Sequence, residues 1–129
     1  MVMPAAKMGD WAVAIDIHLI QPPASVPPVP TPHPFNGLIT GGLSPNVTIE
    51  GKPAATAGSV AVNTPPHLPI GGTFVVPPLN QGRILTGSFT VTINGKPAAR
   101  AGDMVMTCDD PTESPMGQVV AVSMVLIGG

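Results

Sequence analysis

One short phrase occurs twice in the chain, and it constrains the fold more than any other feature of the sequence. Residues 47–58 read VTIEGKPAATAG and residues 91–102 read VTINGKPAARAG, so ten of twelve positions are identical at a spacing of 44 residues. A shorter copy begins at residue 4, and three copies in 129 residues indicate one small unit used three times around a pseudo-three-fold axis. The repeated motif consists of Pro4, Ala5, Ala6, Pro53, Ala54, Ala55, Pro97, Ala98, Ala99 and Arg100.

Local patterns predict β-structure throughout. Residues 11–20 alternate between an apolar face and a face that carries Asp16 and His18, which is typical of a half-buried strand. The pairs Glu50-Gly51 and Asn94-Gly95 predict tight hairpin turns, in which both central residues take a positive φ. No segment has a helical period, so we expect an all-β, closed, pseudo-three-fold fold. Further strands are predicted over residues 38–40, 47–50, 59–63, 73–76, 84–93, 104–107 and 119–127, the last as a continuous buried strand.

Composition favours a single domain over residues 1–129. Proline and glycine number 33, but 43% apolar content argues against solvated disorder. Seven prolines lie in residues 21–34, which predicts an extended, polyproline-like loop; a ligand for a proline-binding module is the alternative.

Charge and hydropathy exclude several classes of function. The net charge is −2 and the five basic residues are scattered, so nucleic-acid binding is not expected. No apolar run is long enough to span a membrane. The first residues lack the apolar core of a secretion signal, so we expect synthesis in the cytoplasm without a signal peptide and, if the protein leaves, export by other means.

The complete inventory of histidine and cysteine matches one tetrahedral zinc site: His18, His33, His67 and Cys108. His18 and His67 each follow a motif glycine by nine residues, so the repeat supports this pair. Cys108 departs from that register, and His33 lies in the proline-rich segment. A metal would also stabilise a core with only 3% aromatic residues. The alternatives are three unrelated histidines with a buried apolar cysteine, or another metal such as iron.

Catalysis is not expected. The sequence contains no HExxH, no Gly-x-Ser-x-Gly and no phosphate-binding loop. Asp109, Asp110 and Glu113 follow Cys108, and we interpret them as a solvated turn. A small metallohydrolase that uses the three histidines and leaves Cys108 free is the enzymatic alternative, because a catalytic zinc keeps one position open.

The third motif, with Ile-Asn-Gly-Lys before it, Gly102-Asp103 within it and Cys108 after it, resembles the PAAR-repeat family. The second copy is also close, with Thr56 in place of arginine, and the first is partial.

This resemblance implies a small conical β domain with one structural zinc near its apex, held by three histidines and a cysteine. It also implies a membrane-piercing tip, one per trimer, on the VgrG-like spike of a contractile injection machine, such as a type VI secretion system, an extracellular contractile particle or a phage-tail-like particle. Such a tip touches the target membrane transiently, can carry effector or toxin cargo, and is exported or released with the particle. A free-standing zinc-stabilised adaptor for toxin or effector loading is the alternative function.

Overall fold

The computed structural model describes residues 2–129, and over this range the chain is all-β, without a helix. Six strands that follow one another in sequence form a closed barrel, because the last of them pairs with the first. The barrel strands are β2 (Trp11–Gln21), β3 (Val29–Gly41), β6 (Val60–Asn63), β8 (Gln81–Ile84), β11 (Met104–Thr107) and β12 (Ser114–Val120). A short strand, β7 (Thr73–Phe74), pairs with the far end of β2. Closure leaves the barrel without the free edges of an open sheet.

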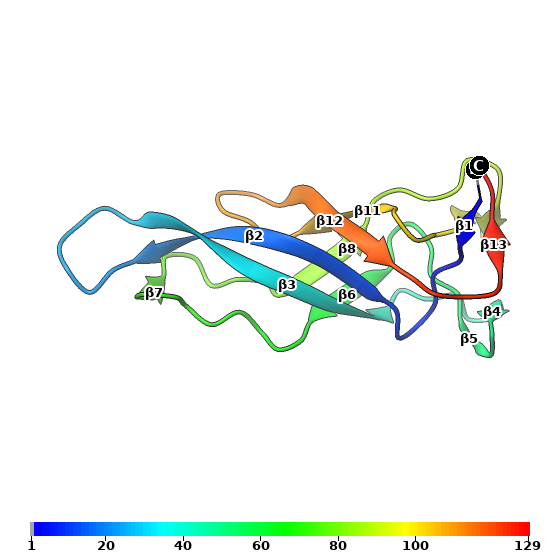
Figure 1. The fold of residues 1–129 in the computed structure, drawn as a ribbon, viewed down its shortest axis with the longest axis horizontal. Coiled ribbons are helices and arrows are strands. Elements are labelled where there is room, and N and C mark those ends of the chain that lie inside the picture. Colours follow the sequence, from blue (N-terminus) through cyan, green and yellow to red (C-terminus); the bar gives the residue numbers. More distant parts are fainter. Residues whose placement is uncertain (1) are drawn as a thin grey trace.

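The molecule is elongated and tapers toward one end (Figure 1). The narrow end is the turn between β2 and β3, and the broad end, which we call the base, carries the small hairpins and both chain ends. The base hairpins are β4 (Thr48–Ile49) with β5 (Lys52–Pro53), β9 (Thr92–Ile93) with β10 (Lys96–Pro97), and β13 (Leu126–Ile127) with β1 (Met3–Pro4). The predicted all-β conical fold is confirmed.

The two hairpin turns have the predicted geometry. Glu50 and Asn94 have φ values of 51° and 53°, and the glycines that follow have 81° and 80°. Positive φ at both central residues matches the twist of the flanking strands, which explains why Glu-Gly and Asn-Gly occupy these turns.

The third hairpin is assembled from the two ends of the chain. Met3 pairs with Ile127 and Pro4 with Leu126, in the register that Lys52 and Pro53 have with Ile49 and Thr48. The amide of Ala5 donates to the carbonyl of Val125, as that of Ala54 does to Val47 and that of Ala98 to Val91. The C-terminal strand therefore completes the first repeat unit, which explains why that copy is partial in the sequence.

The three motifs meet in a ring of backbone hydrogen bonds. The amide of Ala6 donates to the carbonyl of Ala99 (3.0 Å), that of Ala99 to Ala55 (3.1 Å) and that of Ala55 to Ala6 (3.0 Å). Each bond joins equivalent residues of two units, so the single chain reproduces three-fold symmetry. All six motif alanines have no exposed surface. Alanine is required here because three backbones approach one another.

At the end of each motif, a glycine redirects the chain into a barrel strand. Gly9, Gly58 and Gly102 have φ values of 91°, 96° and 88°, a region that favours glycine. Their amides donate to Ile39, Ile84 and Val119, which are equivalent residues on the three strands that return to the base. These three side chains are buried and form the layer of the barrel core next to the motifs.

Several predicted strands are confirmed and others are wrong in extent. The predictions for residues 11–20 and 104–107 match β2 and β11 in extent. On β2, however, the buried face is the one that carries Asp16 and His18, and Ile15 on the apolar face is exposed. The single strand expected over residues 84–93 is broken, because the chain leaves β8 at Ile84 and enters β9 only at Thr92. The buried strand expected over residues 119–127 is also wrong. There the chain passes from the barrel to the base, and Val122 and Met124 are exposed.

The prediction of a polyproline-like loop over residues 21–34 also needs correction. Residues 29–34 belong to β3 and pair with β2, so the loop covers only residues 22–28. Pro30, Pro32 and Pro34 alternate along β3, opposite Leu19, Ile17 and Ile15. Strand β6 pairs with β3 only from Gly37 onward. Proline is tolerated in a strand where its missing N–H would point to an unpaired edge.

Candidate metal centre

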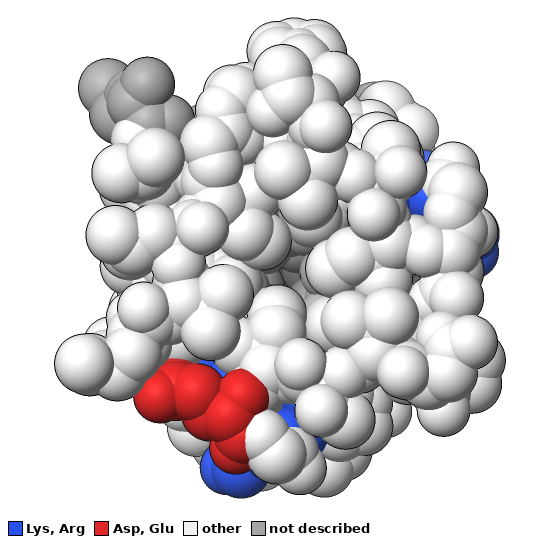
Figure 2. Space-filling view, turned by 90° about the vertical axis from the view of Figure 1, so that its right-hand side faces the viewer, with Lys and Arg blue, Asp and Glu red and all other residues white. Residues whose placement is uncertain are grey.

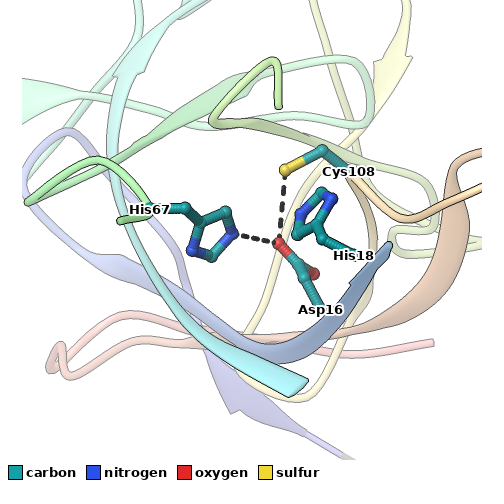
Figure 3. A group of neighbouring side chains, drawn as sticks. All are labelled: Asp16, His18, His67 and Cys108. Carbon is teal, nitrogen blue, oxygen red and sulfur yellow. Dashed lines mark hydrogen bonds and ion pairs between the residues drawn. The ribbon is translucent and has the colours of Figure 1, made fainter. Parts of the chain in front are cut away.

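A polar cluster lies inside the barrel, on the narrow side of its apolar core (Figure 3). Asp16 and His18 project from the same inward face of β2, and His33 lies on β3. Cys108 directly follows β11, and His67 lies in the segment after β6. All five side chains are buried, with at most 8% of their surface exposed. Strands from all three repeat units thus bring together residues that are up to 92 positions apart.

Four of these residues form a compact group of donor atoms. Asp16, His18, His67 and Cys108 each offer one ligand atom, and the four atoms lie within 4.8 Å of one another. Asp16 Oδ2 accepts hydrogen bonds from His67 Nε2 (2.8 Å) and from Cys108 Sγ (3.3 Å) (Figure 3). Imidazole, thiolate and carboxylate groups are ligands for divalent transition metals, so this group could hold a metal ion.

His33 lies against the group without being one of the four. Its ring centroid is 5.5 Å from those of both His18 and His67. Its Nδ1 lies 2.9 Å from the carbonyl oxygen of Thr31, so Nδ1 carries the proton and donates it, leaving the Nε2 lone pair free. Burial lowers the pKa of His33, which favours the neutral ring that a metal requires. The ligand set of three histidines and Cys108 stays a prediction, and the structure adds Asp16 to it.

The unsatisfied polar atoms of the protein point to the same place. Over residues 2–129, the buried side-chain nitrogen and oxygen atoms without a hydrogen-bond partner are Asp16 Oδ1, both ring nitrogens of His18, and His33 Nε2. Buried polar groups normally have partners, because leaving one unpaired costs about 1–3 kcal/mol. Four such atoms in one cluster are therefore what a site for a cation requires, and the residues fit a metal.

The Cys108 thiol depends on a cation to ionise. Burial first, and the neighbouring Asp16 carboxylate second, raise the pKa of the Cys108 thiol to about 12. Without a cation the group therefore remains a neutral thiol. A metal ion binds the thiolate and would displace this proton.

The loop after Cys108 holds β2 in place beside the cluster. Asp109 Oδ1 accepts from the amide of Ile17 (2.6 Å) and Asp110 Oδ2 from the amide of Leu19 (2.8 Å), on either side of His18. The interpretation of Asp109 and Asp110 as a solvated turn is therefore wrong, since both are partly buried. Glu113 is exposed, as expected. Burial also raises the pKa of Asp109.

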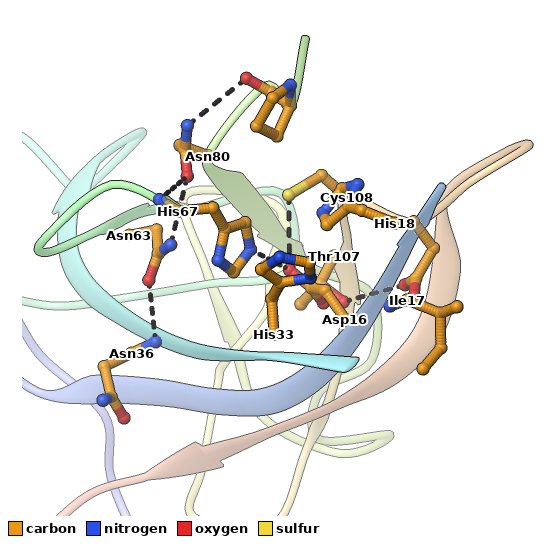
Figure 4. A network of polar contacts seen from close by, with 12 residues as sticks. Asp16, Ile17, His18, His33, Asn36, Asn63, His67, Asn80, Thr107 and Cys108 are labelled. Carbon is orange, nitrogen blue, oxygen red and sulfur yellow. Dashed lines mark hydrogen bonds and ion pairs between the residues drawn. The ribbon is translucent and has the colours of Figure 1, made fainter. Parts of the chain in front are cut away.

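A second network positions His67 (Figure 4). Asn80 Oδ1 accepts from the His67 amide (2.7 Å) and from Asn63 Nδ2 (3.1 Å). Asn63 Oδ1 in turn accepts from the amide of Asn36 on β3 (2.9 Å). Phe74 covers the cluster, with ring centroids 5.7 Å from His18 and 5.5 Å from His33. Groups outside the donor atoms therefore fix the orientation of the donors, as in protein metal sites.

Sequence reasoning missed Asp16 as a member of the site. The signal was present, because Asp16 and His18 are two residues apart and therefore share a face of a strand. A carboxylate on the inward face of a barrel strand needs a partner, and that requirement identifies it.

Comparison with known protein families agrees with the repeats. Residues 76–129 match the family model described as PAAR motif, so the resemblance seen in the sequence is confirmed. The matched range covers the third motif, its hairpin and Cys108. Residues 76–129 therefore carry a PAAR motif, and the motif supports a spike-tip role in contractile injection systems. The family is structural and not catalytic.

No curated protein and no solved structure gives a significant match to the chain. Across residues 2–129, no helix has the length and apolarity needed to cross a membrane.

Proposed function

We propose that this protein caps the trimeric spike of a contractile injection machine and forms its membrane-piercing tip. The observation that carries the proposal is the three-fold symmetry of the base. One chain reproduces this symmetry through three equivalent hairpins and through the alanine ring, the cycle of backbone hydrogen bonds among Ala6, Ala55 and Ala99. A monomer with this symmetry can present equivalent backbone to each chain of a symmetric trimer, so the expected stoichiometry is one tip per three spike chains.

The surface of the base supports the same role. Most atoms that face the viewer in Figure 2 belong to uncharged residues, and the acidic and basic atoms lie toward the edges of this face. Segments of the base also expose large apolar side chains, including Phe89 (93%), Met124 (88%) and Val122 (79%). Exposed apolar side chains at the base fit a surface that another protein covers.

The metal is part of this proposal. We propose one structural zinc held by His18, His33, His67 and Cys108, on the narrow side of the core. When bound, it would cross-link strands of all three units where too few side chains exist for an apolar core. A tip that meets a membrane under load needs such rigidity, and structural zinc contributes directly to folding free energy. Export with the particle and attachment of effector cargo complete the proposal.

Co-expression with the spike protein of the same machine tests the role. We expect a complex with one tip per three spike chains by native mass spectrometry. Met124→Asp should abolish the complex, because it places a charge in the apolar base. Val26→Asp, on the loop at the narrow end, is the matched control and should bind normally. A ratio of three to three, or full binding by Met124→Asp, would contradict capping. Binding of an effector but not of the spike would favour the adaptor function.

A further inference from the structure

The two longest strands, β2 and β3, extend as a two-stranded ribbon toward the narrow end of the molecule (Figure 1). Strand β6 pairs with β3 only from Gly37 onward. Along residues 29–36, β2 is the only strand that pairs with β3 in the part of the chain that the structure describes. This side of the ribbon is therefore an open sheet edge, and an open edge is a template on which another chain can add a strand.

The opposite edge of the ribbon, which belongs to β2, is closed by hydrogen bonds. The amides of Ile17 and Leu19 donate to Asp109 Oδ1 (2.6 Å) and Asp110 Oδ2 (2.8 Å). The carbonyl oxygens of the same two residues accept from the amides of Asp110 (2.8 Å) and Val75 (3.1 Å). The backbone groups of Ile17 and Leu19 therefore point away from β3.

The open edge, which belongs to β3, carries prolines. Pro32 lies opposite Ile17, and Pro30 lies opposite Leu19. Facing residues of an antiparallel pair either exchange two hydrogen bonds or none. Because Ile17 and Leu19 bond elsewhere, the backbone nitrogens and carbonyls of the two prolines face the open edge, and those of Pro34 follow by alternation. Proline has no N–H, so this edge presents carbonyl oxygens at three successive outward positions and no donor.

The next outward residue of β3 has the same orientation and does have partners. The amide of Asn36 donates to Asn63 Oδ1 (2.9 Å), and its carbonyl oxygen accepts from the amide of Thr64 (2.9 Å). The prolines therefore begin at the point where the partners of this edge end.

Charge does not protect this edge. The sequence contains no Lys, Arg, Asp or Glu between Asp16 and Glu50, so β3 has no such residue. No segment buries the edge either, because Pro30, Pro32 and Pro34 are all exposed. Charged side chains, covering segments and prolines are the usual protection of an exposed strand edge, and here the prolines alone are present.

We propose that Pro30, Pro32 and Pro34 block strand addition at the narrow end, so that a second copy of this chain cannot pair edge to edge with the first. A strand placed against this edge would have its carbonyl groups opposite proline rings and would make only half of its ladder bonds. The alternation is essential, because prolines at positions 29, 31 and 33 would instead remove bonds to β2. This inference concerns the free chain and depends neither on the metal nor on the spike.

The full chain with Pro30→Thr, Pro32→Thr and Pro34→Thr tests the proposal, because threonine restores the three N–H groups and favours strands. In sedimentation equilibrium, we expect the mass of this variant to rise reversibly with concentration toward that of a dimer, while the wild type stays monomeric. Hydrogen exchange should show the three new amides protected at high concentration and unprotected after dilution.

The matched control replaces three prolines of the loop over residues 22–28, which lies outside the strand. Pro22→Thr, Pro23→Thr and Pro27→Thr together change as many prolines in the same way, and this variant should stay monomeric. Association of the control or of the wild type would overturn the proposal.

A folded edge variant, judged by its circular dichroism spectrum, that stays monomeric at the highest concentration would also overturn it. Association that protects amides other than those of residues 29–34 would have the same meaning. If the triple variant does not fold, Pro30→Thr with Pro32→Thr restores two adjacent outward donors. We expect this double variant to dimerise more weakly at the same edge, and a folded, monomeric double variant would decide against the proposal.

Discussion

At the scale of single residues, the cluster around Cys108 contains most of the chemistry of the protein. Its donors are buried, and those atoms that lack partners lie together. The same groups that would hold a metal ion are therefore destabilising without one. The stability of the fold should therefore depend on the metal through each of these side chains separately.

Cys108→Ser should therefore lose the metal and much of the stability. Elemental analysis of the untagged wild type, purified without chelator, is expected to give about one zinc per chain, and the variant close to none. Thermal unfolding should show a large decrease in Tm for the variant, and chelator should lower the Tm of the wild type to a similar value. Chelator should not affect the variant further. An unchanged Tm in the variant, or a folded wild type without metal, would remove the metal from the account of stability.

At the scale of elements, the three motifs are interchangeable turns with different side chains. The charged pairs Lys7–Asp10 and Arg100–Asp103 close two of them. In the second copy, which has no such pair, the amide of Thr56 donates to Ser59 Oγ (2.9 Å). The backbone hydrogen bonds of the turn are the same in all three motifs. The Pro-Ala-Ala segment and the glycine therefore set the geometry of the motif, and the ion pair does not.

The equivalence of the three alanines in the ring can be tested by substitution. Ala6→Val, Ala55→Val and Ala99→Val should each lower the free energy of unfolding by a similar amount, about 1–3 kcal/mol, because each overpacks an equivalent buried position. Urea unfolding measures this. Ala57→Val is the control, because the equivalent residue of the first unit is Met8 and a larger side chain is tolerated there. Widely different costs at the three ring positions would contradict the equivalence.

At the scale of the whole molecule, strands β13 and β1 pair with each other in the register of a hairpin. Ile127 and Met3 pair as Ile49 and Lys52 do, and Gly129 has the same φ, 81°, as Gly51. The β13–β1 pair therefore has the strand register of the β4–β5 hairpin.

A circular permutant tests this closure. Joining Gly129 directly to Met3 recreates a two-residue Gly-Gly turn, and new ends are placed between Asn94 and Gly95. We expect this protein to fold, with its metal content unchanged and its circular dichroism spectrum that of the parent. A permutant opened between Val105 and Met106, inside barrel strand β11, should fail to fold. If opening at the hairpin turn also prevents folding, the three hairpins are not equivalent.

The sequence by itself determined the repeat, the all-β class, the hairpin turns and the identity of the histidine and cysteine donors. These follow from local rules: glycine at positive φ, alternation along a strand, and the chemistry of each side chain. Tertiary structure alone decided that the C-terminal strand completes the first unit, that residues 29–34 join β3, and that Asp109 and Asp110 hold β2. It also brought Asp16 to Cys108, 92 residues away. Contacts of this kind depend on how the barrel closes, and no local pattern records which strand edges meet.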